Sequence, residues 1–151
     1  MTAHSFTALH GTGGVVTGPA LMSSKPFSAR YDLDRRIGVI SRKGHPLRGM
    51  SIKGHILVTR SVEGGVAAGW ALLAMARLQI GFAGLVFNET NPAMVQGAVL
   101  AGIPIVAGLP QEVFETFDTG QLLTLEGTLK QLTVVSAVVG APATSDGSQN
   151  Y

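Results

Sequence analysis

A glycine-rich turn, SVEGGVAAG over residues 61–69, follows an apolar run typical of a strand and precedes a run typical of a helix. Glycines at the start of a helix let the backbone amides face an anion, and the helix dipole favours negative charge there. Gly64 and Gly65, with the adjoining Val66, therefore predict a site for a carboxylate or phosphate group. The alternative is a turn that only lets the helix pack closely on the sheet.

The glycine spacing excludes two common phosphate-binding loops. No Gly-Lys-Ser/Thr follows the turn, as a Walker loop requires, and GGVAAG lacks the spacing of a dinucleotide fingerprint. The ionisable residues beside the turn are Arg60 and Glu63, and Ser61 is the nearest serine. The turn thus offers an anion site without a complete catalytic set.

A second polar cluster lies in FNETNPAMVQG, residues 87–97. Asn88 and Glu89 follow an apolar run that reads as a parallel strand, and ligands of open α/β sheets bind at the carboxyl ends of such strands. We predict that both residues contact a substrate. Helix capping by Asn91 in a solvated loop is the alternative.

The basic residues are unevenly distributed. Nine of the eleven Lys and Arg residues lie between Lys25 and Arg60, although the net charge is only +2. This segment could face an anionic small molecule, an acidic partner subunit or solvent. Nucleic acid is not expected, because aromatic residues are few and no nucleic-acid motif is present. We also predict substrate contacts from Ser24, Lys25 and Arg60, at the two ends of the segment.

Composition limits the chemistry that this chain can carry. It has no cysteine, which excludes disulfides, iron–sulfur ligation and a cysteine nucleophile on this chain. Its four histidines lack a metal-ligand spacing, so we expect no metal here. No signal peptide and no membrane-spanning stretch are recognised. We expect a cytoplasmic protein with no membrane partner.

Turn signals and hydrophobic patterns divide the chain into strands and helices that could position these residues. The predicted strands are Phe6–Leu9, Gly14–Leu21, Arg36–Ser41, Ile56–Thr59, Gly84–Asn88, Ile105–Ala107, Gln121–Glu126 and Gln131–Val135. The predicted helices are Val66–Gln79 and Pro92–Ala101. The order predicts a mixed α/β sheet or flattened barrel with flanking helices, in one domain over residues 1–140. Residues 141–151 are small and polar, and we expect a flexible tail.

The string GPALMSSKPFSARYDLDRRIGVISRKGHPLRGMSIKGHILV, residues 18–58, resembles the small subunit, or swivelling domain, of aconitase X-type dehydratases. GAVLAGIPIV, residues 97–106, is also similar to the family pattern. The matching residues are Gly18, Ala20, Leu21, Phe27, Ser28, Asp32, His45, Pro46, Leu47, Gly49, Ser51, Gly54 and Ile56–Val58.

The resemblance implies a swivelling β/β/α domain and a larger aconitase X-type catalytic subunit that carries an iron or iron–sulfur centre. It implies loss of water from a small anionic hydroxy acid, such as a hydroxyproline or a phosphorylated mevalonate. In that family the turn reads approximately Gly-Ser-x-x-Gly-Ser, and its first serine acts on the substrate proton. Gly65 stands at that serine position here. Glu63, if desolvated, or Ser61 is therefore the candidate catalytic base.

Two other functions compete with this interpretation. A non-catalytic swivelling domain could bind a partner or an anion, as loss of the serine suggests. The strands ILVT, GLVF and GIPIVAG also resemble the mobile phosphohistidine domain of phosphoenolpyruvate-using enzymes. That domain needs a phosphorylatable histidine before its GIP segment, and NETNPAMVQGAVLAGIP contains none.

Overall fold

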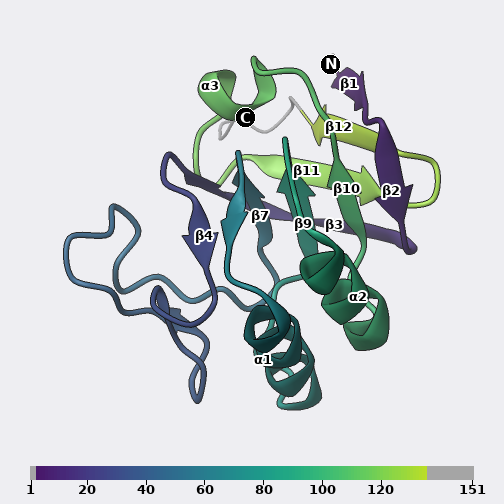
Figure 1. Cartoon of the computed structure of the whole chain (residues 1–151). Coiled ribbons are helices and arrows are strands. Elements are labelled where there is room, and N and C mark those ends of the chain that lie inside the picture. Colours follow the sequence, from purple (N-terminus) through teal and green to yellow (C-terminus); the bar gives the residue numbers. More distant parts are fainter. Residues whose placement is uncertain (1–2, 136–151) are drawn as a thin grey trace, which may run out of the picture.

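An eight-stranded mixed sheet with the strand order β1-β12-β11-β3-β7-β9-β10-β2 forms the body of the fold in the computed structural model (Figure 1). The structure describes residues 3–135, so the predicted tail 141–151 lies outside the described residues. The predicted single domain over residues 1–140 stays a prediction.

The elements are, in chain order, β1 (Ala3–Thr7), β2 (His10–Thr12), β3 (Val15–Ser23), β4 (Phe27–Ser28), β5 (Leu33–Asp34), β6 (Val39–Ile40), β7 (Ile56–Thr59), β8 (Val62–Glu63), α1 (Val66–Arg77), β9 (Gly84–Phe87), α2 (Pro92–Ala101), β10 (Ile105–Ala107), α3 (Val113–Thr116), β11 (Leu122–Glu126) and β12 (Gln131–Val135). Strands β4 and β8 form a separate parallel pair, and β5 and β6 a separate antiparallel pair.

The strands β7, β9 and β10 are buried along their whole length and pair in parallel with one another, whereas β10 pairs antiparallel with β2 on its other side. Because successive side chains of a strand point to opposite faces, such strands need a cover on both faces. Leu57, Leu85 and Ile105 pack in the core cluster that contains buried residues of α1 and α2. Ile56 and Val86 pack in a second cluster with buried residues of β11 and β12.

Strand β3 joins the two sheet regions. Its residues 15–19 pair antiparallel with β11, and its residues 20–23 pair parallel with β7. One continuous strand therefore belongs to both sheet layers, and the helices form the third. The predicted β/β/α arrangement is confirmed. Within residues 3–135 no strand pairing joins the outer strands β1 and β2, so the sheet is open and the flattened barrel is not closed.

The boundaries of α2 were readable from sequence. The Asn91 side chain accepts a 2.9 Å hydrogen bond from the Met94 amide, and Pro92 stands in the first turn. Gly102 ends the helix with φ 73°, a left-handed value that glycine adopts without steric cost. The structure confirms Ile56–Thr59, Pro92–Ala101, Ile105–Ala107 and Gln131–Val135 with unchanged bounds.

Two predicted strands are placed differently. Phe6–Leu9 is wrong as a unit, because β1 ends at Thr7 and β2 begins at His10. Arg36–Ser41 is reduced to the two residues of β6. The amides of Ile37 and Gly38 both donate to the Asp34 carbonyl, which makes a turn where extended backbone was expected.

Helices α1 and α2 lie side by side on one face of the sheet (Figure 1) and touch through glycine. A Cβ atom added at Gly97 would lie 2.7 Å from the Gly69 carbonyl oxygen and closer still to the Gly69 Cα. A Cβ added at Gly69 would lie 2.6 Å from the Ala93 carbonyl oxygen. The missing side chains allow this approach, which keeps α2 close to the start of α1.

We expect Gly97→Ala to lower the free energy of unfolding by about 1–3 kcal/mol, because the added methyl group overpacks the helix crossing. Urea unfolding of the purified chain measures the effect. Gln96→Ala is the matched control, since Gln96 is exposed on the same helix. Equal unfolding midpoints for the two variants would contradict a close helix contact.

His45 is buried in the irregular segment between β6 and β7, and its Nδ1 accepts a 3.0 Å hydrogen bond from the Leu47 amide. This acceptor requires the neutral imidazole. Burial, its largest cause, lowers the pKa of His45 in the folded chain, and the charges of Lys25 and Arg42 act in the same direction. The Asp32 carboxylate opposes them.

The lowered pKa of His45 makes the unfolded chain the better proton acceptor at this position. The stability that neutral His45 contributes is therefore full above the unfolded pKa of about 6.5 and declines as the pH falls below it. We expect the urea midpoint to drop between about pH 7.5 and about pH 5.5, and His45→Gln to make that drop smaller. His10→Gln, at an exposed histidine, should keep the wild-type slope. An unchanged slope in His45→Gln would contradict the assignment.

Candidate functional site

The parallel strands β3, β7, β9 and β10 end at one edge of the sheet. Three predicted pairs of site residues therefore follow neighbouring strands, namely Ser24 with Lys25, Arg60 with Ser61, and Asn88 with Glu89. Hydrogen bonds join the three segments. The Thr59 hydroxyl donates to the Lys25 carbonyl at 2.8 Å, and the Glu89 amide donates to the Arg60 carbonyl at 2.8 Å.

A hollow of about 270 Å³ opens beside this edge, at the N-terminus of α1. The glycine-rich turn contributes Glu63, Gly64 and Gly65 to its lining. The other lining residues are Ser28, Arg30, Tyr31, Ala67 and Ala68. The hollow thus combines an exposed carboxylate, an exposed guanidinium and the first turn of a helix.

The two glycines of the turn have different backbone requirements. Gly64 has φ 102°, a left-handed value in which a side chain is strained. Gly65 is the N-cap of α1, has φ −125° and makes no side-chain cap hydrogen bond, since it has no side chain. A Cβ atom added at Gly65 would meet nothing within 4 Å. Position 65 therefore has room for a side chain beside the hollow, and position 64 does not favour one.

A second part of the lining comes from β4 and the turn that follows it. Ser28 of β4 pairs with Glu63 of β8 in parallel register. The Arg30 guanidinium carbon lies 5.3 Å from the centre of the Tyr31 ring, within the range of a cation–π contact. Ser28, Arg30 and Tyr31 were not among the predicted site residues. Two sequence signals pointed to this part of the lining: Arg30 belongs to the basic segment, and Ser28 matches the family pattern.

Some predicted site residues lie outside the lining of the hollow. Arg60 donates from Nη2 to Glu115 Oε2 of α3 at 2.6 Å, and both side chains are about half exposed. Ser61 is partly exposed, and its carbonyl oxygen accepts from the Phe27 amide. Val66 is 68% exposed and lines a small groove between α1 and α2. The substrate and catalytic roles of these residues stay predictions.

The remaining predicted contacts divide between structural and exposed positions. The Asn88 side-chain amide donates to the Leu109 carbonyl at 2.9 Å and so joins β9 to the segment after β10. The Ser24, Lys25 and Glu89 side chains are exposed at the strand ends. These three remain accessible for a ligand or a partner.

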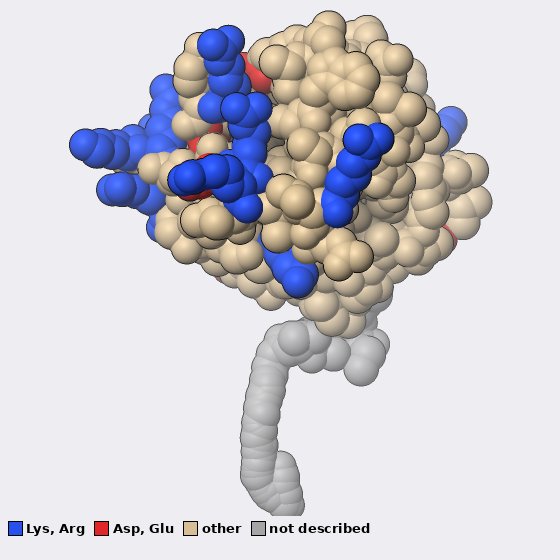
Figure 2. All heavy atoms as spheres, turned by 90° about the horizontal axis from the view of Figure 1, so that it is seen from below, with Lys and Arg blue, Asp and Glu red and all other residues tan. Residues whose placement is uncertain are grey.

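The basic segment forms one side of the molecule. Figure 2 shows Lys and Arg side chains gathered on one side, next to a broad surface with few charged residues. Arg36 pairs with Asp34 at 3.1 Å, and Arg42 pairs with Asp32 at 3.1 Å. Arg30 extends this positive charge to the hollow, because it lines the hollow and belongs to the same segment.

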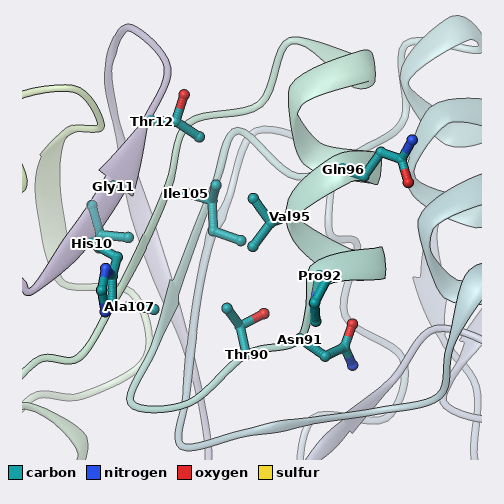
Figure 3. Close-up of a pocket in the computed structure, with 11 residues that line it drawn as sticks. His10, Gly11, Thr12, Thr90, Asn91, Pro92, Val95, Gln96, Ile105 and Ala107 are labelled. Carbon is teal, nitrogen blue, oxygen red and sulfur yellow. The ribbon is translucent and has the colours of Figure 1, made fainter.

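A larger cavity, of about 550 Å³, lies elsewhere, between α2, β10 and β2 (Figure 3). Val95 and Ile105 face its centre, whereas the Gln96 amide points away from it. Its lining contains neither Lys nor Arg, and no Asp or Glu. The larger cavity is therefore less suited to an anion than the hollow beside Gly64, which Arg30 lines, and the anion site at the hollow stays a prediction.

The residues of this chain do not fit an iron–sulfur centre. The full sequence contains no cysteine, and no group of three His, Asp or Glu residues within residues 3–135 could hold a metal ion. We therefore assign chemical roles in this chain only to its own side chains and backbone amides. In the described part of the chain, no helix combines the length and apolar character needed to cross a membrane.

Known proteins resemble this chain in sequence and in structure. The family description "Aconitase X swivel domain" matches residues 5–134. The phosphomevalonate dehydratase small subunit of Methanocella arvoryzae is 31% identical over 116 residues, which cover 77% of this chain and 88% of that protein. The same subunit of Methanocaldococcus jannaschii is 33% identical over 105 residues, with 70% and 80% coverage.

The fold is also found in a solved structure. The aconitase X of Thermococcus kodakaraensis, in its holo-form, superposes with a TM-score of 0.81 and 21% identity, covering 88% of this chain and 99% of the matched chain. The relatives named above are subunits of a dehydratase, and a small subunit implies a larger partner. This chain therefore belongs to the aconitase X swivel-domain family.

Proposed function

We propose that this chain is the small subunit of a hydro-lyase that removes water from a small anionic hydroxy acid. The observation that carries the proposal is the hollow at the start of α1, where Glu63, Arg30 and the Gly64–Gly65 turn come together. Phosphomevalonate is the first substrate to test, because it appears in the names of the relatives. A hydroxyproline is the second.

The hollow suits the anionic part of such a substrate. The start of α1 has no side-chain cap. The Ala68 amide donates to the Gly65 carbonyl at 3.0 Å, so we assign binding of a carboxylate or phosphate oxygen to the amides of Val66 and Ala67. Arg30 adds a guanidinium, which pairs well with either anion. Its contact with Tyr31 restricts the conformations of the Arg30 side chain, so the side chain loses less conformational entropy when an anion binds.

Elimination breaks a C–H bond on one carbon and the C–O bond on its neighbour, and it forms a C=C bond and water. We assign acceptance of the proton to the Glu63 carboxylate, which lines the hollow beside the anion site. Ser61 is the second candidate, although it does not line the hollow. We assign departure of the hydroxyl group to the larger subunit, on which we expect the iron or iron–sulfur centre.

The larger subunit also has a steric role in this proposal. Glu63 and Arg30 are exposed in the chain by itself. A partner that closes over the strand ends excludes water from the hollow and strengthens the charge interactions within it. Weak activity of the isolated chain follows. A cytoplasmic location and the absence of nucleic-acid partners stay predictions from sequence.

The test is co-expression with a candidate larger subunit, followed by assays of the purified complex for loss of water from phosphomevalonate and from a hydroxyproline. Turnover that requires both chains supports the proposal. A complex that forms but dehydrates neither compound would count against the reaction while leaving the family assignment intact.

We expect Glu63→Gln to lower kcat of the complex by about 100-fold or more, because a general base contributes that much to proton transfer. Gln keeps the size of the side chain but cannot take the proton. Ser61→Ala is the matched comparison on the same turn. Loss of activity in Ser61→Ala alone would transfer the role to Ser61, and full activity in both variants would exclude both.

Gly65 favours a second candidate function, that of a non-catalytic binding subunit. The position that resembles the catalytic serine of the family has open space and no side chain. In that case the chain binds the partner and an anion without turnover. Complex formation together with an inactive wild type and unchanged phosphate binding in Glu63→Gln would favour it.

We expect Gly65→Ser to change stability by less than about 0.5 kcal/mol, because glycine and serine are both acceptable N-cap residues. Gly64→Ser should cost about 1–3 kcal/mol, since a serine there is held in the left-handed region. Thermal unfolding compares the two variants. In the complex, Gly65→Ser should also raise kcat by restoring a hydroxyl group at the hollow. An unchanged kcat would contradict a role of position 65 in proton transfer.

A further inference from the structure

Asp32 is the exception among the charged residues of the basic segment, because its side chain is only 2% exposed. A buried carboxylate loses its hydration and is tolerated where partners satisfy its oxygens. The nearby Asp34 has a side chain that is 25% exposed and pairs with Arg36 at the surface. The surface pair of Asp34 and Arg36 needs no special explanation, whereas the burial of the Asp32 carboxylate does.

Both oxygens of the Asp32 carboxylate are engaged. Oδ2 accepts a 2.8 Å hydrogen bond from the Ser28 amide, and Oδ1 accepts a 3.1 Å bond from Arg42 Nη1. The backbone repeats the first link, because the Asp32 amide donates to the Ser28 carbonyl at 2.9 Å. The Ser41 amide donates to the Asp32 carbonyl at 2.8 Å, next to Arg42. Asp32 thus closes the turn 28–32 and joins it to the chain after β6.

This turn lines the hollow next to Glu63. Ser28, at its start, is the register partner of Glu63. Its hydroxyl accepts a 3.3 Å bond from the Tyr31 amide, which fixes the inside of the turn. Arg30 and Tyr31 lie between Ser28 and Asp32 in the chain, and both line the hollow. The Asp32 carboxylate thus acts together with the β4–β8 pairing to hold this part of the lining beside the candidate base.

We propose that Asp32 is a positioning residue of this site, which holds Arg30 and Tyr31 at the hollow beside Glu63 by fixing the turn 28–32. The proposal rests on the proposed function, because it assigns Asp32 to the placement of the substrate anion. It also explains the burial. A carboxylate accepts from the Ser28 amide and from Arg42 at once, and no neutral side chain of similar size accepts at both oxygens.

Asp32→Asn tests the proposal with the smallest change. The asparagine amide nitrogen is a donor and must face either the Ser28 amide or Arg42, which are both donors. We expect KM of the complex for phosphomevalonate to rise by about 10- to 100-fold, because the loss of one charge-assisted hydrogen bond to the substrate anion weakens binding by a factor of that size. Asp34→Asn is the matched control, since it removes the charge of the neighbouring aspartate from a surface pair.

The split between KM and kcat separates positioning from mere stability. A variant that only unfolds part of the molecules lowers the apparent kcat in proportion to the lost active sites and leaves KM unchanged. A raised KM in Asp32→Asn, with Asp34→Asn within about twofold of the wild type, supports the proposal. If the complex is active and the two variants have equal KM values, the positioning role of Asp32 is overturned and the proposed function is not. A wild-type complex without turnover overturns the proposed function, and the positioning role with it.

Ser28→Ala keeps the proposal testable if Asp32→Asn fails to fold. It removes the hydroxyl that accepts from the Tyr31 amide and leaves the carboxylate of Asp32 in place. We expect a smaller rise of KM with the same sign and faster amide hydrogen exchange at Tyr31. Unchanged exchange together with an unchanged KM would show that the turn does not control the site.

Discussion

The burial of β7, β9 and β10 on both faces is the constraint on which the rest of the structure depends. A strand with no solvent-facing side chains has to be covered twice, and the chain supplies two different covers. Helices α1 and α2 cover one face, and the antiparallel strands β11 and β12 cover the other. Because both faces of these strands are covered, the ends of the strands are where polar residues can reach solvent, and the predicted polar site residues lie there.

The covers also fix the start of α1, where the candidate site lies. Gly69 and Gly97 let the two helices touch, and Asn91 donates from its side chain to the Gly64 carbonyl at 3.1 Å. The anion-friendly turn is thus held from the side of α2 by packing and by a hydrogen bond. On its other side the Ser28–Glu63 register holds it against β4. The turn is supported by both neighbours although it carries two glycines.

The distribution of charge suits a site that a partner completes. The hollow carries an exposed carboxylate and an exposed guanidinium, and Figure 2 shows that the basic segment stands to one side of a broad surface with few charges. Under the proposed function, this chain would contribute anion binding and a base, and the larger subunit would close the site and supply the electrophile. Burial of the Asp32 carboxylate costs hydration free energy. In our proposal, that cost is offset because Asp32 keeps the turn 28–32 in a fixed position.

The sequence determined the elements whose signals are local. The alternation of apolar runs with Asn91, Pro92 and Gly102 defined α2 with its bounds, and the ends of β7 and β10 were equally clear. These signals act within a few residues, because capping and backbone conformation depend on neighbours in the chain. The same locality placed Gly64 and Gly65 at a helix start and located the polar edge of the sheet.

The tertiary structure alone decided the wall of the hollow and the partner of Arg60. Strands of two residues, such as β4 and β8, have no periodicity to read, and they exist because Ser28 and Glu63 meet across the fold. Arg60 pairs with Glu115, which is distant in sequence, so its engagement was not visible beforehand. Asp32 matches the family pattern in sequence, but no role in the site was predicted for it. Its burial depends on how the turn 28–32 packs, which no pattern of neighbouring residues encodes.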